Sequence, residues 1–497
     1  MNFPAGLIIL IICAIAYWFS WRSMAQQKKF LALFLLVFIG LILRLYLSSD
    51  FYLHYWDERY HALVSKNMMN HLLIPTLYEN PIFPFSYQDW SGNHIWVHKQ
   101  PMPLWSMSIS MMLFGVNEIA IRLPSILMST FGILITYRIS KHFFNSKTAF
   151  IAAFLYSIHG LIIELTGGRV ATDHIDLFFM FFIQLAVLMA LEFARNGKVL
   201  LNVLCGVFIA CAVLTKWLPA LIVLPIWGLA LLHYKTSKPR YIAIHFLVLV
   251  GVIAIVALPW QFYIHKVFPD EAIWEASYNR KHFTSVLGGQ TAPFYYYFDK
   301  VRLIFGEITI LALLFLAVIV SKRRKTPKYW IFVIWIFIPI AFFSLAATKM
   351  QGYILLTAPA IFIVGAFFYS FLRMNLYRYK YKIVAKLVLF FLIALPVRYS
   401  IERLKPFDKT ERKPMWVTQL KEFGQETADV KGVIFNVSHP IEAMFYTDLM
   451  AYERLPEKAV LDSLIDQGYS VFINDKGAKS TVEYNETKYQ KVSIEER

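Results

Sequence analysis

The sequence predicts an all-α polytopic membrane protein with a small α/β domain at its C-terminal end. Of 497 residues, 58% are hydrophobic, 17% are aromatic and only 16% are charged, and the mean hydropathy is +0.52. Such a chain is too apolar for a soluble multi-domain protein of this length. A bilayer-crossing helix needs roughly 20 apolar residues. About twelve runs of that kind occur, at 5–22, 29–48, 120–140, 147–166, 174–193, 199–216, 218–233, 242–260, 304–321, 330–347, 352–372 and 383–397.

The basic residues indicate the orientation of these spans. The formal net charge is +17, and most lysines and arginines lie in short joints such as "WRSMAQQKK", "YKTSKPRY" and "SKRRKTPKYW". The joints fall on alternate sides of the predicted spans, so the positive-inside rule places them in the cytoplasm and no nucleic-acid partner is expected. Both termini then face outside, together with the loops at about 49–119, 167–173, 261–303 and 348–352 and the tail after 398.

The spans and the tail divide the chain into three predicted parts. These are an extra N-terminal transmembrane helix (1–28), a transmembrane domain (29–397) and an extracytoplasmic α/β domain (398–497). The first run lacks a preceding basic residue and a small-residue cleavage pattern, so we expect a retained span rather than a signal peptide. In the tail, "GVIFNV" and "SVFIN" predict strands, whereas "MWVTQLKEFGQETAD" and "AVLDSLIDQGY" predict helices.

The first large outer loop contains two predicted interfacial segments. From Glu58 to Leu73 the apolar residues are spaced as on one helical face, which predicts a helix lying along the membrane surface. Leu104–Phe114 is apolar but too short to cross, so we expect it to be interfacial or re-entrant. Pro101 and Pro103 are expected to hold the chain extended before it.

Acidic residues mark two of the predicted outer rims. Asp57 and Glu58 follow the span at 29–48, and Asp173 precedes the span at 174–193. A lone acid at such a rim is most often a solvated cap. Charged groups near a membrane interior are costly, however, and usually face a cavity or one another, and two acidic rims on the same side can converge on one cavity.

Cationic and aromatic residues lie on the same predicted side. They are His98 and Lys99 in "VHKQPMPLW", Arg280, Lys281 and His282 in an aromatic-rich loop, and Lys349 and Tyr353 in "ATKMQGYILLTAP". Each alone is more often a membrane anchor. Together with the acids they suit a phosphate-bearing lipid, because Lys and Arg hold phosphate and a carboxylate can accept a proton from an attacking hydroxyl. That combination indicates glycosyl transfer from a polyprenyl-phosphate sugar.

No nucleotide-binding loop accompanies these residues. Neither G-x-x-x-x-G-K-[ST] nor G-x-G-x-x-G occurs, so nucleotide binding by either route is not expected. A sugar that is already activated on a lipid phosphate needs no such site.

The order of these motifs resembles that of membrane glycosyltransferases of the C-type fold (GT-C). The motifs are "YWDERYHALVSKNM", "HKQPMPLWSMSISMMLFGVNEIAIRLPS", "ATDHIDLFFMFF", "LTKWLPALIVLP" and "TKMQGYILLTAP", and the resemblance covers about residues 30–370. Within GT-C the chain looks most like protein O-mannosyltransferases and bacterial aminoarabinose transferases of lipid A. The resemblance implies that Asp57 is the catalytic carboxylate with Asp173 beside it. It also implies that Lys99, a basic residue among Arg280 to His282, and Tyr353 hold the lipid phosphate.

The chain departs from the family pattern at two positions. Gln100 replaces the first proline of the usual Lys-Pro-Pro, and His98 stands where aminoarabinose transferases carry an acid. The sugar and the metal dependence therefore do not carry over. The sequence establishes no cofactor. It leaves open whether a divalent cation binds, with His98 as the candidate ligand.

The implied reaction is a single displacement that inverts the anomeric carbon. Asp57 is the expected general base toward a hydroxyl acceptor, with Glu58 orienting it; toward an anionic phosphate acceptor Asp57 positions a substrate instead. The cations and Tyr353 stabilise the departing phosphate. His174, Asp176 and Lys216 are candidate supporting residues, and they fit equally well as polar groups satisfied at helix ends.

Two other functions are compatible with about twelve spans. A carrier or flippase for a lipid-linked sugar would place charges near the bilayer midplane and show two similar halves, and neither feature is visible. A polymerase or ligase of surface polysaccharide would share the donor side. The expected partners are a polyprenyl-phosphate sugar, membrane lipids and a lipid, glycan or protein acceptor. The expected location is a bacterial-type inner membrane with the active site on the periplasmic face.

Overall fold

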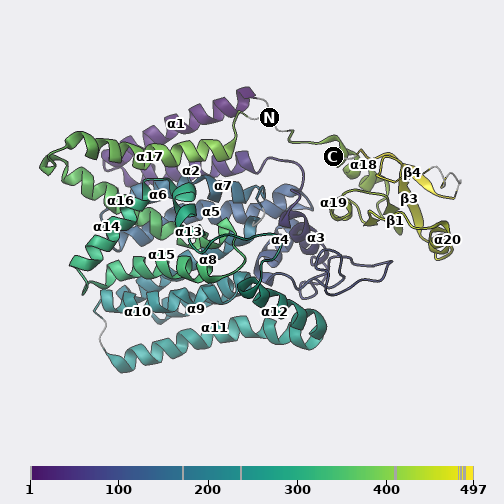
Figure 1. The fold of residues 1–497 in the computed structure, drawn as a ribbon, viewed down its shortest axis with the longest axis horizontal. Coiled ribbons are helices and arrows are strands. Elements are labelled where there is room, and N and C mark those ends of the chain that lie inside the picture. Colours follow the sequence, from purple (N-terminus) through teal and green to yellow (C-terminus); the bar gives the residue numbers. More distant parts are fainter. Residues whose placement is uncertain are drawn as a thin grey trace. The chain divides into compact units, whose positions relative to one another are not determined.

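The structure is a computed structural model that describes residues 3–170, 173–235, 238–407, 411–479, 481, 484 and 488–495 (Figure 1). The chain forms two compact units. The helical unit comprises Met1–Ser48, Lys99–Pro103 and Arg122–Lys409, and the mixed unit comprises Ser49–His98, Leu104–Ile121 and Thr410–Arg497. Each has its own hydrophobic core.

Long apolar helices build the helical unit, which confirms a multi-pass membrane protein. Within the described residues, nine helices are long and apolar enough to cross a membrane, or up to eleven if each of two bent pairs is one span. The nine are α1 (Phe3–Ala25), α2 (Lys29–Leu47), α5 (Glu118–Lys141), α8 (Asp173–Asn196), α9 (Val199–Lys216), α11 (Pro239–Val267), α15 (Pro327–Leu345), α16 (Ala358–Met374) with the preceding η2 (Gln351–Thr357), and α17 (Lys382–Leu404).

The remaining predicted runs are helical but not straight spans. Two are broken pairs, α6 (Ser146–Ser157) with α7 (Gly160–Thr166), bent by 49°, and α13 (Tyr296–Phe305) with α14 (Thr309–Lys322), bent by 114°. The predicted spans at 147–166 and 304–321 are therefore each divided into two helices. The run at 218–233 forms the shorter η1 (Leu218–Ile222) and α10 (Val223–His233), and η3 (Leu376–Arg378) precedes α17.

A buried histidine explains the first break and ties it to the second. His159 Nδ1 accepts a hydrogen bond from the Ile162 amide and so caps α7 (3.3 Å), while Nε2 donates to the Ile304 carbonyl near the end of α13 (2.8 Å). Gly306 follows α13 with φ +98°, a left-handed conformation that favours glycine. Local side-chain bonds and one glycine thus interrupt two otherwise continuous apolar runs.

Two segments predicted to be extended or loop-like are helical instead. Pro101 and Pro103 lie in the first turn of α4 (Pro101–Phe114), where a missing amide hydrogen costs nothing because first-turn donors have no intrahelical partner. Arg280, Lys281 and His282 lie on α12 (Pro269–Thr284) rather than in a loop. That helix has Pro269 at its first position and Asp270 and Glu271 in its first turn, all typical of a helix start.

The mixed unit is built on a four-stranded parallel sheet with strand order β2-β1-β3-β4. The strands are β1 (Gly432–Phe435), β2 (Met450–Tyr452), β3 (Ser470–Asn474) and β4 (Gln490–Val492), with helices α18 (Met415–Glu426), α19 (Pro440–Tyr446) and α20 (Lys458–Asp466). Ile434 and Phe472 belong to one hydrophobic core, and Val433 and Val471 to another. Because successive strand residues face opposite sides, the sheet is covered on both faces, and the predicted α/β tail is confirmed.

The first large loop contributes a helix to one of these cores. In α3 (Asp57–Asn67) the side chains of Tyr60, Leu63 and Val64 are buried with Trp416 and Leu420 of α18. The predicted extension of this helix to Leu73 is wrong. Asn67 ends it and donates from Nδ2 to the Thr76 and Leu77 carbonyls (2.9 and 3.0 Å).

Candidate active site

Two of the predicted phosphate-binding residues of the helical unit, Lys99 and His282, lie near one face of α12. Glu275, Asn279 and His282 follow one another at i, i+4 and i+7, so they share that face. Asn279 Nδ2 donates to Glu275 Oε1 (2.8 Å). Lys99 lies close enough to Glu275 and His282 to influence the ionisation of both. Lys99 and His282 were predicted from the sequence, whereas Glu275 was not, although the i, i+4, i+7 spacing in "WEASYNRKH" could have revealed it.

Burial controls the charges of this cluster. It raises the pKa of Glu275 to about 8, with Lys99, and His282 when it is protonated, opposing the rise. It lowers the pKa of His282, and Lys99 lowers it further. Near neutral pH, Glu275 therefore keeps its proton and His282 is neutral. The buried carboxyl group therefore adds no negative charge near Lys99 at neutral pH.

The backbone brings the end of α12 to the segment that contains Lys349. The Thr348 amide donates to the His282 carbonyl (2.9 Å), the Ala347 amide to the Phe283 carbonyl (3.2 Å), and the Lys349 amide to the Gln290 carbonyl (3.0 Å). The buried Lys349 ammonium donates to the carbonyl of Ala346, the C-cap of α15, where a cation is favourable. Lys349 thus already stabilises a helix end.

Arg280 lies on a different face of α12 from His282. Five positions after Glu275, it is exposed, and its Nε donates to the Ala276 carbonyl of its own helix (3.3 Å). Of the basic residues 280–282, only His282 shares the face of Glu275.

A second charged group joins α8, α9 and η2. Lys216 forms an ion pair with the buried Asp176, and its ammonium lies 4.3 Å from the centroid of the Tyr353 ring. His174, at the start of α8, pairs through Nδ1 with Ser125 Oγ (2.8 Å). Asp173 begins α8, and its side chain lies outside the described part. Tyr353 is therefore positioned by a lysine that the sequence assigned only a supporting role.

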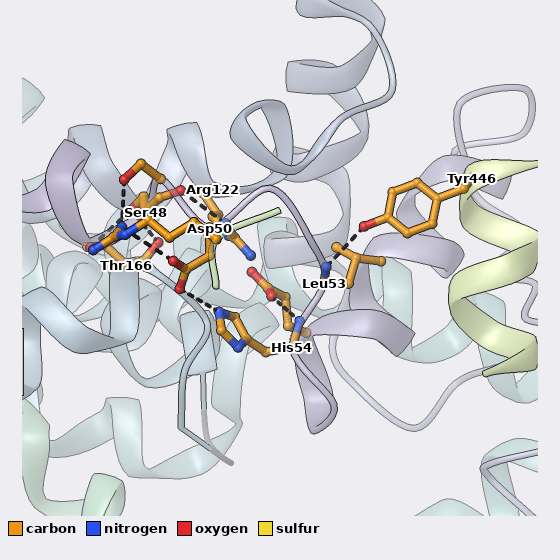
Figure 2. Close-up of polar contacts among 10 residues, drawn as sticks. Ser48, Asp50, Leu53, His54, Arg122, Thr166 and Tyr446 are labelled. Carbon is orange, nitrogen blue, oxygen red and sulfur yellow. Dashed lines mark hydrogen bonds and ion pairs between the residues drawn. The ribbon is translucent and has the colours of Figure 1, made fainter. Parts of the chain in front are cut away.

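In the mixed unit, Asp57 and Glu58 occupy the first turn of α3, where acids interact favourably with the helix dipole. Glu58 is fully buried, and its Oε2 accepts a hydrogen bond from the His54 amide (2.7 Å). Asp57 is partly exposed. Figure 2 shows the segment leading into this turn, in which His54 pairs with Asp50 (3.3 Å). The two adjacent acids thus differ, since Glu58 closes the turn and Asp57 reaches solvent.

His98, the candidate metal ligand, packs against tryptophans. Its ring stacks on Trp90 (4.8 Å between centroids, 11° between planes) and meets the edge of Trp96 (5.5 Å). Among the described residues, no three His, Cys, Asp or Glu side chains form a group that could hold a metal ion. Gln100, the other residue that departs from the family pattern, accepts a hydrogen bond at Oε1 from Gln261 Nε2 (2.8 Å). This glutamine therefore links the start of α4 to α11.

Sequence comparison relates the chain to known glycosyltransferases. The model of the dolichyl-phosphate-mannose-protein mannosyltransferase family matches residues 98–261. An undecaprenyl phosphate-alpha-4-amino-4-deoxy-L-arabinose arabinosyl transferase of Pseudomonas fluorescens is 29% identical over 290 residues, 54% of this chain and 46% of that protein. The chain thus matches about half the length of this curated relative.

Two solved structures share the fold over most of the chain. ArnT from Cupriavidus metallidurans, bound to undecaprenyl phosphate, superposes with a TM-score of 0.61 at 17% identity and 88% coverage of both chains. The oligosaccharyltransferase AglB of Archaeoglobus fulgidus gives a TM-score of 0.54 at 14% identity, covering 86% of this chain and 64% of that one. The fold is therefore that of the GT-C membrane glycosyltransferases, as the sequence predicted. Within this class the chain is similar to the ArnT type.

Proposed function

We propose that this protein transfers a sugar from a polyprenyl-phosphate donor to an acceptor at the outer face of a bacterial inner membrane, inverting the anomeric configuration. The observation that carries the proposal is the sequence similarity to curated aminoarabinose transferases. The charged cluster around Lys99 and the absence of nucleotide-binding loops support it.

The donor phosphate is assigned to the helical unit. Lys99 supplies the positive charge, His282 shares the α12 face beside it, and Tyr353 donates from its hydroxyl. Arg280 and Lys349 are assigned to the outer margin of the same phosphate site. As the bond between the anomeric carbon and the phosphate oxygen breaks, negative charge grows on the phosphate, and fixed cations and donors stabilise the transition state. The polyprenyl tail lies among the apolar helices.

The acceptor is assigned to the side of Asp57. With a hydroxyl acceptor, Asp57 takes the proton as the acceptor oxygen bonds to the anomeric carbon, which can contribute about a hundred- to ten-thousand-fold. With a phosphate acceptor, as in a lipid A-like lipid, no proton is removed and Asp57 orients the substrates. Glu58 holds the turn and Asp173 completes the acidic set. We favour a lipid acceptor, with a glycan or a protein as the other classes.

The test is sugar transfer by the purified protein. Wild type, Asp57→Asn and Lys99→Ala are incubated with a labelled undecaprenyl-phosphate sugar and membrane extract. The matched controls are Asp466→Asn and Lys325→Ala, which alter exposed residues of α20 and of a basic joint. We expect transfer by wild type and controls and strongly reduced transfer in both site variants, and the labelled product identifies the acceptor class.

The same preparation tests the carrier alternative. If no donor and acceptor pair gives transfer while the protein moves a lipid-linked sugar across vesicles, the glycosyltransferase assignment is wrong. If the labelled product is an elongated glycan, the chemistry is that of a polysaccharide polymerase or ligase.

A further inference from the structure

The segment that leads to Asp57 is held by side chains from the far end of the chain. Asp50 is fully buried; its Oδ1 lies 3.3 Å from Arg412 Nη1 and its Oδ2 3.3 Å from His54 Nε2. The Phe51 amide donates to the Arg412 carbonyl (2.7 Å). A buried carboxylate needs such partners. Residues 50–54 are thus fixed to the chain just before α18.

A tyrosine of α19 holds the next residue. The Leu53 amide donates to the Tyr446 hydroxyl (3.0 Å), as Figure 2 shows. The same hydroxyl donates to Glu118 Oε1 (2.8 Å), which also accepts from Lys421 (2.7 Å). Because Tyr446 is engaged on both sides, its hydroxyl is a fixed acceptor for the segment before α3.

An ion pair with α19 holds the first turn of α3 itself. Arg59 Nη1 lies 3.4 Å from both carboxylate oxygens of Glu442, and the side chains are only 11% and 1% exposed. The guanidinium also lies over the rings of Tyr55 (4.2 Å) and Tyr60 (4.9 Å). Burial lowers the pKa of Arg59, and Glu442 and the tyrosines raise it by more, so the guanidinium stays charged.

The last turn of α3 is attached to the same helix. Lys66 donates to the carbonyls of Met444 (2.9 Å), Phe445 (3.0 Å) and Thr447 (2.6 Å) and pairs with Asp448 (3.1 Å). These carbonyls end α19, where a cation is favourable. The helix is thereby fixed at both ends, and the contacts advance in the same direction along α3 and α19.

We propose that Glu442 is a positioning residue for Asp57 and that the α/β domain serves to hold the acidic turn in register. Asp57 precedes Arg59 by two residues in the first turn of α3, so a rotation of that turn displaces both side chains. Releasing Arg59 moves the carboxylate away from the acceptor, and a misplacement of about 1 Å can cost on the order of a hundredfold in rate. This proposal rests on the proposed function.

The decisive experiment is a double-mutant cycle with Glu442→Gln and Asp57→Asn. Glu442→Gln alone should lower kcat about ten- to a hundredfold and leave the affinity for undecaprenyl phosphate unchanged. In the Asp57→Asn background it should have no further effect, because its action passes through Asp57. Glu442→Asp should recover part of the rate, and Glu422→Gln, an exposed glutamate of α18, is the matched control.

A structural readout keeps the proposal testable without activity. In Glu442→Gln, amide hydrogen exchange should rise in residues 53–64, whereas exchange in the apolar helices should match wild type. If Glu442→Gln slows transfer equally in both backgrounds, or weakens undecaprenyl phosphate binding as much as transfer, the positioning role is wrong. If the wild type transfers no sugar, the proposed function fails, and unchanged exchange in 53–64 would separately overturn the role of Glu442.

Discussion

The helical and mixed units differ in the charge of the buried groups around their site residues. Around Lys99 the buried Glu275 keeps its proton near neutral pH, so this carboxyl group adds no negative charge there. Around Asp57 the buried charges are matched, Asp50 with Arg412 and Arg59 with Glu442. A carboxyl group that stays neutral near a lysine repels an anionic ligand less than a carboxylate would. Matched pairs indicate a framework that holds one conformation.

The largest expected effect breaks the framework of the mixed unit. Trp416 is 4% exposed and belongs to the core that includes α3, so Trp416→Ala should cost about 4 kcal/mol of local stability. Hydrogen exchange in residues 415–473 should rise strongly, while undecaprenyl phosphate binding is retained. Trp330→Ala, at a residue 37% exposed, is the control. If Trp416→Ala also lost undecaprenyl phosphate binding, the two units would not have separate cores.

A somewhat smaller effect is expected when one buried charge of the framework loses its partner. Asp50→Asn leaves Arg412, only 9% exposed, without a carboxylate and should cost about 3 kcal/mol. Opening of residues 49–54, followed by hydrogen exchange, measures this cost. Arg412→Gln in the same background should restore part of the stability, because it removes the uncompensated charge. Additive losses would instead mean that the two side chains are not coupled.

The pH dependence of donor binding tests the cluster around Lys99. Folded Glu275 holds its proton up to about pH 8, whereas the unfolded chain releases it near pH 4.5. The folded state therefore binds more protons between these values, and stability falls as pH rises across that window. Above pH 8 the carboxylate neutralises Lys99, so undecaprenyl phosphate affinity should fall. Glu275→Gln should flatten both profiles, and an unchanged profile would contradict the assignment.

The smallest effect separates Arg280 from His282 on α12. Arg280 is exposed and lies off the face of Glu275, so Arg280→Ala should change undecaprenyl phosphate affinity by less than about twofold. His282→Ala should weaken it more, since His282 lies beside Lys99. A larger loss in Arg280→Ala would assign the phosphate to the other face of α12.

Sequence pattern and structure agree where one physical signal dominates. Every predicted apolar run is helical, because a long apolar segment can satisfy its backbone in a bilayer only as a helix. The strands "GVIF" and "SVFIN" were predictable because parallel strands buried on both faces are continuously apolar. The breaks at His159 and Gly306 were not, since each depends on a side-chain bond or a backbone angle that apolar composition does not reveal.

The amino-acid sequence alone determined the membrane class, the helix content, the α/β tail and the residue types suited to a lipid phosphate. Hydropathy and charge are properties of short segments, so they can be read without knowing the fold. Only the tertiary structure decided that burial raises the pKa of Glu275 and that Glu442 forms an ion pair with Arg59. Burial and ion pairing depend on which distant segments meet, and residues 59 and 442 are brought together by the packing of α3 on α19 rather than by any local pattern.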